Sequence, residues 1–254
     1  MRRLVSDTLV IAERNLIRLP RAPELLLAFT VQPIMFLLLF RYVFGGAINT
    51  GGIPYVEFLI PGIIVQNIAF GGFVTGLGLN EDMHKGLIDR FRSLPMARPA
   101  VLAGRTLADV VTNALAVAIL LVTGVIIGFV FHAPVLHIVG GIALLLVFGY
   151  AFSWVFAFVG LLVSTPEAAN SVGFIFVFPL TFISSAFVPV ATMPAVLRAF
   201  ATVNPFTVTV DAMRELWIGV PAGNDVWGAF VWAAVILVVF APLAVARYRH
   251  LAGR

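Results

Sequence analysis

Long runs of apolar residues, separated by short charged stretches, dominate this sequence of 254 residues. A helix needs about 20 mostly apolar residues to cross the hydrocarbon core of a bilayer, and six stretches meet that requirement. The predicted spans lie near residues 24–44, 58–79, 108–131, 137–163, 168–190 and 226–246. The runs are apolar on all sides and do not alternate as membrane β-strands do. The pattern therefore predicts an all-α protein that crosses a membrane several times.

The boundary between the fourth and fifth spans is predicted at Ser164–Glu167, which interrupts about sixty apolar residues. Ser or Thr commonly caps a helix, and Pro and Glu are favoured in its first turn. We therefore expect a tight turn there, followed directly by the next helix.

Residues 3–20 are predicted to form a basic amphipathic helix on the cytoplasmic membrane surface. At 100° per residue one face is apolar and the opposite face is polar. The apolar face holds Val5, Leu9, Ala12, Leu16 and Leu19, and the polar face holds Arg3, Asp7, Arg14 and Arg18. The helix is either a topological anchor alone or also a lever that contacts a cytoplasmic partner.

Residues 81–94 show a second helical pattern, because Met83, Leu87, Phe91 and Leu94 recur at helical spacing until Pro95 ends it. Charges of both signs flank these residues. A short amphipathic helix of this kind suits docking into a groove of another protein, and the alternative is a solvated loop. The candidate docking residues are Glu81, Asp82, Lys85, Asp89, Arg90, Phe91 and Arg92.

The segment 191–225 is the only long one on the opposite side, and it is too apolar for a free loop. Helical stretches are expected at Pro194–Phe200 and Asp211–Trp217, with a break at Asn204–Pro205. They would dip into the outer leaflet or form an interfacial cap.

The amino-acid composition excludes several classes of protein. The chain is 61% hydrophobic and only 11% charged, with a mean hydropathy of +1.06, so a water-soluble fold and disorder are both excluded. The absence of Cys excludes disulfides and thiol chemistry. The net charge of +4 is interpreted as membrane topology rather than nucleic-acid binding.

The basic residues indicate the orientation. Thirteen of the 16 Lys and Arg residues lie in 1–23, 80–105 and the carboxyl-terminal tail. By the positive-inside rule both termini and the 80–105 loop are expected in the cytoplasm. A cleavable signal peptide is not expected.

No catalytic or nucleotide-binding motif is present, and GxxxxGK[ST] does not occur. We therefore predict no enzyme activity in this chain. The centres of the predicted spans carry no ionisable residue, since Glu24, Arg41, Asp109 and His137 fall at predicted span ends, which disfavours a secondary transporter or charged channel.

The spans do offer small and aromatic surfaces. Gly72-xxx-Gly76 and Gly124-xxx-Gly128 would allow close approach of helices. A path for an amphipathic substrate is one interpretation of a polar and aromatic set in the second and fifth spans, and ordinary packing is the other. The set is Gln66, Asn67, Phe70, Phe73, Phe174, Phe178 and Phe182.

Four phrases carry a resemblance to a known family. They are residues 32–46 (QPIMFLLLFRYVFGG), 59–63 (LIPGI), 86–98 (GLIDRFRSLPMAR) and 204–216 (NPFTVTVDAMREL). In these phrases, and along nearly its whole length, the chain resembles the membrane subunit of type-2 ABC exporters, most closely the daunorubicin/doxorubicin-resistance-type permeases of actinobacteria.

The resemblance implies a type-2 ABC exporter fold with six helices in one permease domain, a connecting helix at 3–20, a coupling helix at 81–94 and re-entrant helices at about 192–217. It implies a bacterial plasma-membrane complex of two permeases, identical or sister chains, with two ATP-binding subunits that hold ATP and Mg. Drug-like or lipid-like molecules would leave between the permeases, along the second and fifth spans. A stand-alone secondary transporter or channel is the alternative, and a non-transporting scaffold is a third.

Overall fold

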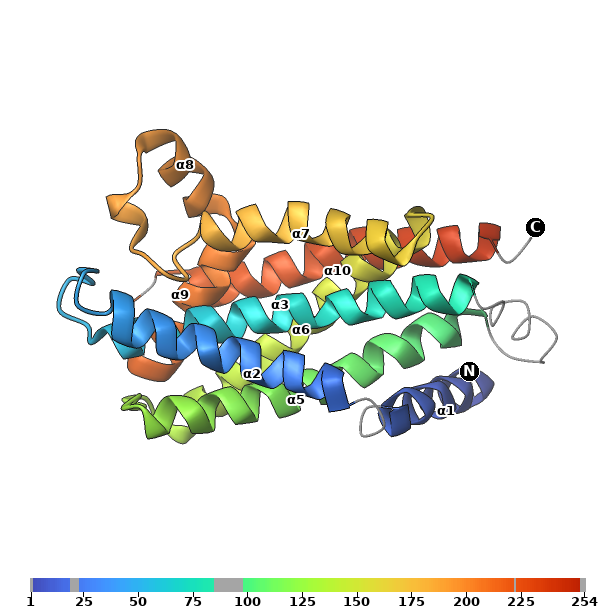
Figure 1. Cartoon of the computed structure of the whole chain (residues 1–254), viewed down its shortest axis with the longest axis horizontal. Coiled ribbons are helices and arrows are strands. Elements are labelled where there is room, and N and C mark those ends of the chain that lie inside the picture. The colour runs from blue at the N-terminus through green and yellow to red at the C-terminus, as the bar shows by residue number, and fades with distance from the viewer. Residues whose placement is uncertain (1, 19–22, 85–97, 222, 252–254) are drawn as a thin grey trace.

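The computed structural model describes residues 2–18, 23–84, 98–221 and 223–251, and this part of the chain contains helices and no strand (Figure 1). The elements in chain order are α1 (Arg2–Arg18), α2 (Pro23–Leu39), a π-helical turn η2 (Phe40–Phe44), α3 (Tyr55–His84), α5 (Arg98–Ile126), α6 (Val135–Leu162), α7 (Pro166–Phe182), a 3₁₀ turn η3 (Val190–Thr192), α8 (Ala195–Val203), α9 (Pro205–Ile218) and α10 (Asp225–Leu251).

The long helices lie side by side along the long axis of the molecule (Figure 1). The end of α3, the end of α10 and helix α1 lie at one end of this bundle, and α8 lies at the other. Among the described helices four are long and apolar enough to cross a membrane: Tyr55–Met83, Ala100–Ile126, Val135–Leu162 and Asp225–Leu251. Thr30–Phe44 and Glu167–Phe182 are shorter apolar helices.

Two predicted boundaries were wrong. The helix expected at 108–131 runs from Arg98 to Ile126, so it begins ten residues earlier and ends five earlier. The helix expected at 168–190 ends at Phe182. It stops there because the side-chain amide of Asn204 donates to the carbonyls of Leu180 and Ile183, at 2.6 and 2.7 Å, and so satisfies the last turn.

The expected turn between the fourth and fifth spans is confirmed. Helix α6 ends at Leu162 and α7 begins at Pro166. The Thr165 hydroxyl accepts a hydrogen bond from the Ala168 amide at 3.1 Å and caps α7.

Helix α3 is central in the bundle, where it contacts α2, α5, α6, α7 and α9. Apolar contact alone contributes little between helices in lipid, so close backbone approach matters more. At the α3–α6 crossing a Cβ on Gly160 would lie only 2.3 Å from the carbonyl oxygen of Gly76. The predicted Gly72-xxx-Gly76 contact is therefore confirmed. The predicted pair with Gly128 was wrong, because Gly128 lies beyond the end of α5 with φ of +102°, and nothing lies within 4 Å of its Cβ position.

Two short helices follow α7, and the second begins earlier than expected. Asn204 caps α9 by accepting from the Phe206 amide at 2.9 Å. Pro205 occupies the first helical position, where its missing N–H leaves no hydrogen bond unmade. The Asn-Pro pair therefore starts a helix that runs to Ile218, instead of interrupting one until Asp211.

Arg214 anchors α9 to the rest of the bundle. Its guanidinium is buried and donates to the carbonyls of Phe58 and Ser185, at 2.8 and 2.7 Å, and to the Asp211 carboxylate at 2.6 Å. It also lies 3.6 Å from the centroid of the Phe58 ring. A buried charge is tolerated only with partners of this kind, so Arg214 is a structural residue rather than a free external charge.

The buried face of α1 differs from the predicted one. Ile11 and Ala12 are buried, whereas Val5 and Leu9 are more than half exposed. The reason is that α1 packs on α5, where a Cβ on Gly104 would lie 2.6 Å from the Thr8 carbonyl oxygen. Ile11 and Ala12 therefore face the rest of the protein. Val5 and Leu9 remain exposed and could contact lipid or another protein.

We predict that Gly160→Ala destabilises the protein by about 1–3 kcal/mol, because the added methyl group overlaps the backbone of α3. Gly140→Ala is the matched control in the same helix, since nothing lies within 4 Å of its Cβ position, and it should be neutral or stabilising by up to about 1 kcal/mol. Thermal unfolding of the two purified variants measures the difference. Equal midpoints would show that the α3–α6 contact is not close.

Candidate functional site

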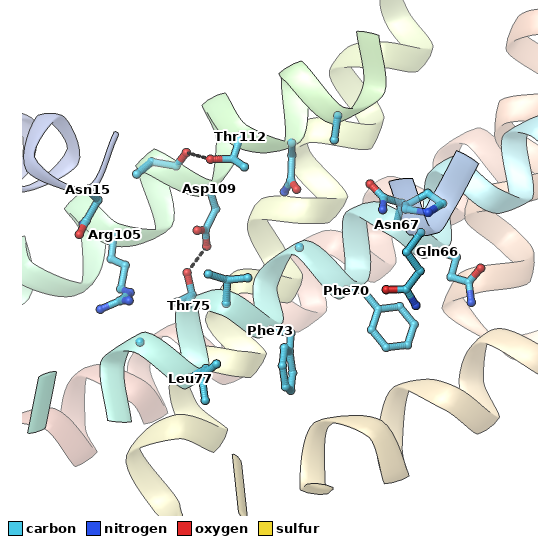
Figure 2. A pocket seen from close by; sticks show the side chains of 18 of the residues that line it. Asn15, Gln66, Asn67, Phe70, Phe73, Thr75, Leu77, Arg105, Asp109 and Thr112 are labelled. Atoms are coloured by element: carbon cyan, nitrogen blue, oxygen red, sulfur yellow. Dashed lines mark hydrogen bonds between the residues drawn. The ribbon is translucent and has the colours of Figure 1, made fainter. Parts of the chain in front are cut away.

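A cavity of about 690 Å³ lies between α2, α3, α5 and α7, with Asn15 of α1 at one end (Figure 2). Twelve of the 30 residues of α3, between Ile63 and Asp82, line its wall. The cavity therefore follows α3 from the middle of the bundle to the end at which α3 approaches residue 84.

The cavity brings together six of the seven residues of the predicted substrate path. Gln66, Asn67, Phe70 and Phe73 of α3 line it, and so do Phe174 and Phe178 of α7. Phe182 does not line it; its ring instead stacks on Phe178, with centroids 4.5 Å apart. The role of these residues in transport stays a prediction.

Aromatic rings continue without interruption from the cavity toward the end of the bundle where α8 lies. The Phe174 ring is 5.6 Å from Phe70 and 5.9 Å from Phe73. Beyond Phe178 and Phe182 the series reaches Phe187 and then Phe40, at centroid distances of 5.0 and 4.6 Å. Phe174 and Phe178 are each more than two-fifths exposed, so this aromatic wall is open to a ligand or to another chain.

The opposite wall of the cavity is polar, and sequence reasoning missed it. Arg105, Asp109, Thr112 and Asn113 of α5 line this side. Figure 2 shows Thr75 and Asp109 pointing toward one another between α3 and α5, where the Thr75 hydroxyl donates to the carboxylate. Phe70 and Phe73 project from the other side of α3.

A signal for this wall was present in the sequence. Arg105, Asp109 and Asn113 recur every four residues and so share one helix face. The predicted span began at residue 108, so Asp109 was expected at the edge of the membrane and not in the wall of a cavity. With α5 beginning at Arg98, Asp109 lies eleven residues into the helix, about 16 Å along its axis.

Asp82 occupies a different place from the one expected of a docking residue. It is 5% exposed, and its carboxylate oxygen lies 2.8 Å from Arg105 Nη1 and 3.5 Å from Arg14 Nη2. The two ion pairs connect α3 to α5 and to α1. Asp82 therefore holds three helices together at the end of the cavity and is turned away from the surface.

Of the other docking candidates, the structure describes only Glu81. Glu81 lies in the cavity wall. Lys85, Asp89, Arg90, Phe91 and Arg92 lie outside the described residues, as does most of the expected 81–94 helix. On α1, Asp7 is partly buried, and the side chains of Arg3 and Arg18 lie outside the described part of the structure.

A second cavity of about 640 Å³ lies near the start of α10 and is lined by His132, His137 and Glu215. His132 Nε2 lies 3.0 Å from Glu57 Oε1. In the ranges that the structure describes, no three His, Asp or Glu side chains are grouped closely enough to hold a metal ion.

Comparison of the sequence with known proteins shows the family to which the chain belongs. Residues 6–218 match the family model described as ABC-2 type transporter. The daunorubicin resistance ABC transporter permease protein DrrB1 of Streptomyces coeruleorubidus is 38% identical over 246 residues, which cover 97% of this chain and 87% of that protein. The probable doxorubicin resistance ABC transporter permease protein DrrC of Mycobacterium tuberculosis is 28% identical over 96% of this chain and 89% of its own length. A putative transport permease, ycf38, of Cyanophora paradoxa is 29% identical over 84% of this chain and 74% of that protein.

We predict that the cavity contains water. Thr112 lines it, whereas its neighbour Val111 is half exposed on the outer surface of α5 and does not line it. The chain has no Cys, so Thr112→Cys and Val111→Cys each introduce a single thiol at the same depth. In lipid nanodiscs a water-soluble methanethiosulfonate should modify Thr112→Cys at least about tenfold faster, because only the hydrated thiol ionises readily. Equal rates would mean that the cavity is filled with lipid or closed.

Proposed function

Since this chain belongs to the ABC-2 type transporter family, we propose that it is the membrane-spanning permease of an ATP-driven exporter. Its cargo would be amphipathic or hydrophobic molecules such as drugs, antibiotics or lipids. A separate ATP-binding subunit would bind ATP and Mg and hydrolyse the ATP. Relatives named as drug-resistance permeases support this proposal.

The proposed architecture has six membrane crossings, formed by α2 with η2, α3, α5, α6, α7 and α10, with α8 and α9 re-entrant from outside. The two shorter apolar helices would complete the four long ones. We place the protein in the bacterial plasma membrane with both termini in the cytoplasm. This orientation is supported by the thirteen basic residues on one side and by α1 lying at the same end of the bundle as the end of α10.

The proposed assembly contains two permeases, identical or sister chains, and two ATP-binding subunits. The surface that suits a second permease is formed by α2 and α7. Its exposed apolar residues include Met35, Tyr42, Ile175 and Phe176. Because residues of the same two helices line the cavity, a second copy would enclose the aromatic wall.

One observation carries the proposed mechanism: residues at the carboxyl-terminal end of α3 also line one end of the cavity. Asp82 and Arg105 line the cavity and also pair with each other, and Asp82 precedes the segment 85–97 in the chain by three residues. When the ATP-binding subunits close, they would displace that segment and α1. Through Arg14, Asp82 and Arg105 the displacement would reach the cavity wall and switch its access from inside to outside.

A stand-alone secondary transporter is the second candidate, and one observation favours it. Asp109 lies inside the bundle, and an ionisable residue at such a place is typical of ion-coupled transport. The two candidates are separated by transport of a hydrophobic dye in inside-out vesicles. The exporter requires the ATP-binding subunit and ATP, and transport by this chain alone would overturn the proposal.

We predict that Phe174→Ala lowers dye export about two- to twelvefold, because one aromatic contact with the cargo contributes about 0.5–1.5 kcal/mol. Phe230→Ala is the control, since Phe230 is comparably exposed on α10 and lies outside the cavity wall. Export rates at equal amounts of membrane protein measure the effect. An equal loss of export in both variants would show that Phe174 does not line the cargo path.

We also predict that Phe91→Ala, or removal of the charge at Asp89 or Arg92, uncouples ATP hydrolysis from export while the variants still fold. The physical reason is the loss of the apolar anchor or the charges through which the segment would dock. Stimulation of the ATP-binding subunit by the permease is the measurement. Full export together with full stimulation would show that the coupling segment lies elsewhere.

A further inference from the structure

A glycine on α3 makes room for the guanidinium group of Arg105. A Cβ on Gly78 would overlap Arg105 Nη2 and would lie 2.8 Å from Cζ. Figure 2 shows the Arg105 side chain reaching from α5 toward this end of α3. The guanidinium therefore lies directly on the backbone of α3, in a notch at Gly78 that the side chain of any other residue would fill.

The notch at Gly78 also sets the position of an ion pair. Asp82 follows Gly78 by four residues and so shares its face of α3. The Asp82 carboxylate lies 2.8 Å from Arg105 Nη1, and the two side chains are only 7% and 13% exposed. A pair so far from water is stabilising only when its geometry is good, because both charges have lost hydration. A shift of the guanidinium out of the notch would therefore weaken the pair.

A second glycine brings α1 to the same place. A Cβ on Gly104, the residue before Arg105, would lie 2.6 Å from the carbonyl oxygen of Thr8. The backbones of α1 and α5 are consequently in close contact, and Arg14 Nη2 lies 3.5 Å from the Asp82 carboxylate. One carboxylate of α3 thus contacts a guanidinium from α5 and another from α1. We call this arrangement the three-helix joint.

The notch at Gly78 differs from another close glycine contact of α3. A Cβ on Gly76 would lie 2.6 Å from the backbone carbonyl oxygen of Phe156 on α6. Backbone at this place cannot move unless α6 moves, whereas the end of an arginine side chain can swing away. A side chain at position 78 would therefore displace Arg105 and leave the packing of the bundle largely intact.

We infer that Gly78 is a positioning residue for energy coupling, an inference that rests on the proposed exporter function. Gly78 acts through Arg105, because the notch holds the guanidinium against Asp82 and so holds the three-helix joint together. An intact joint carries a displacement of α1 to α3 and to the cavity wall, which all three of these residues also line. A larger residue at position 78 loosens the joint, so that ATP is hydrolysed without matching movement of cargo.

Gly78→Ala tests the inference in inside-out vesicles that contain the permease and its ATP-binding subunit. The ATP hydrolysed per molecule of hydrophobic dye exported should rise at least about threefold, within the range over which residues between two sites change their coupling. Gly76→Ala is the control, because it disturbs the packing of α3 on α6 without contacting Arg105. The control should lower the amount of folded protein and leave this ratio unchanged. An unchanged ratio in Gly78→Ala, or an equal rise in both variants, would refute the inference.

A second substitution shows whether the guanidinium is the group that is displaced. Lysine keeps the positive charge for Asp82 but lacks the forked end that overlaps the added methyl group. Arg105→Lys should therefore lower the ATP-to-dye ratio when it is combined with Gly78→Ala. A double variant with a ratio as high as that of Gly78→Ala alone would contradict a role through Arg105.

Thermal unfolding distinguishes the inference from the function on which it rests. The shifts in midpoint caused by Asp82→Asn and Arg105→Gln should be non-additive by about 2–4 °C in the wild type, and additive in the Gly78→Ala background. Additive shifts in both backgrounds, with ATP-dependent export that Gly78→Ala leaves fully coupled, would refute the positioning role and leave the exporter in place. Non-additive shifts that Gly78→Ala abolishes, without any ATP-dependent export, would support the notch for Arg105 and refute the exporter.

Discussion

Every polar group inside this bundle must find a partner within the protein, because hydrocarbon supplies none and each unsatisfied group costs several kcal/mol. That constraint explains the best-defined contacts of the fold. The Arg214 guanidinium is shared among Phe58, Ser185 and Asp211. The Asn204 amide ends α7 and its carbonyl oxygen begins α9. The phrase at residues 204–216, which carries the family resemblance, is therefore mainly a set of structural partners that holds α9 on α3.

The same constraint gives the cavity its functional interest. Its wall contains groups that are satisfied by one another, such as Asp82 and Arg105, and groups that are not, such as the Asn113 amide. The satisfied groups connect α1, α3 and α5. The Asn113 amide nitrogen lies against Gly149 of α6.

The candidate site was predictable where residue type alone was informative. Gln66 and Asn67 are unusual within an apolar span, and Phe70, Phe73, Phe174 and Phe178 repeat at helical spacing, so all six could be selected before their positions were known. Asp109 was missed because a ten-residue error in the start of α5 moved it to a span end. Asp82 was assigned to a partner surface because its sequence neighbours are charged, and only the positions of Arg14 and Arg105 show that it is buried.

The sequence alone determined that the chain is helical and lies in a membrane, that most of its basic residues fall in three segments of the chain, and that α7 begins after Thr165. These properties depend on local composition and on hydrogen bonds between residues a few positions apart, so they can be recognised without a fold. Only the tertiary structure decided that α1 turns Ile11 toward α5, that α7 stops at Phe182, and that Asp109 faces a cavity. Each of these depends on a group more than 20 residues away in the chain, and the rotation of one helix against another is set by such distant contacts rather than by the helix's own pattern.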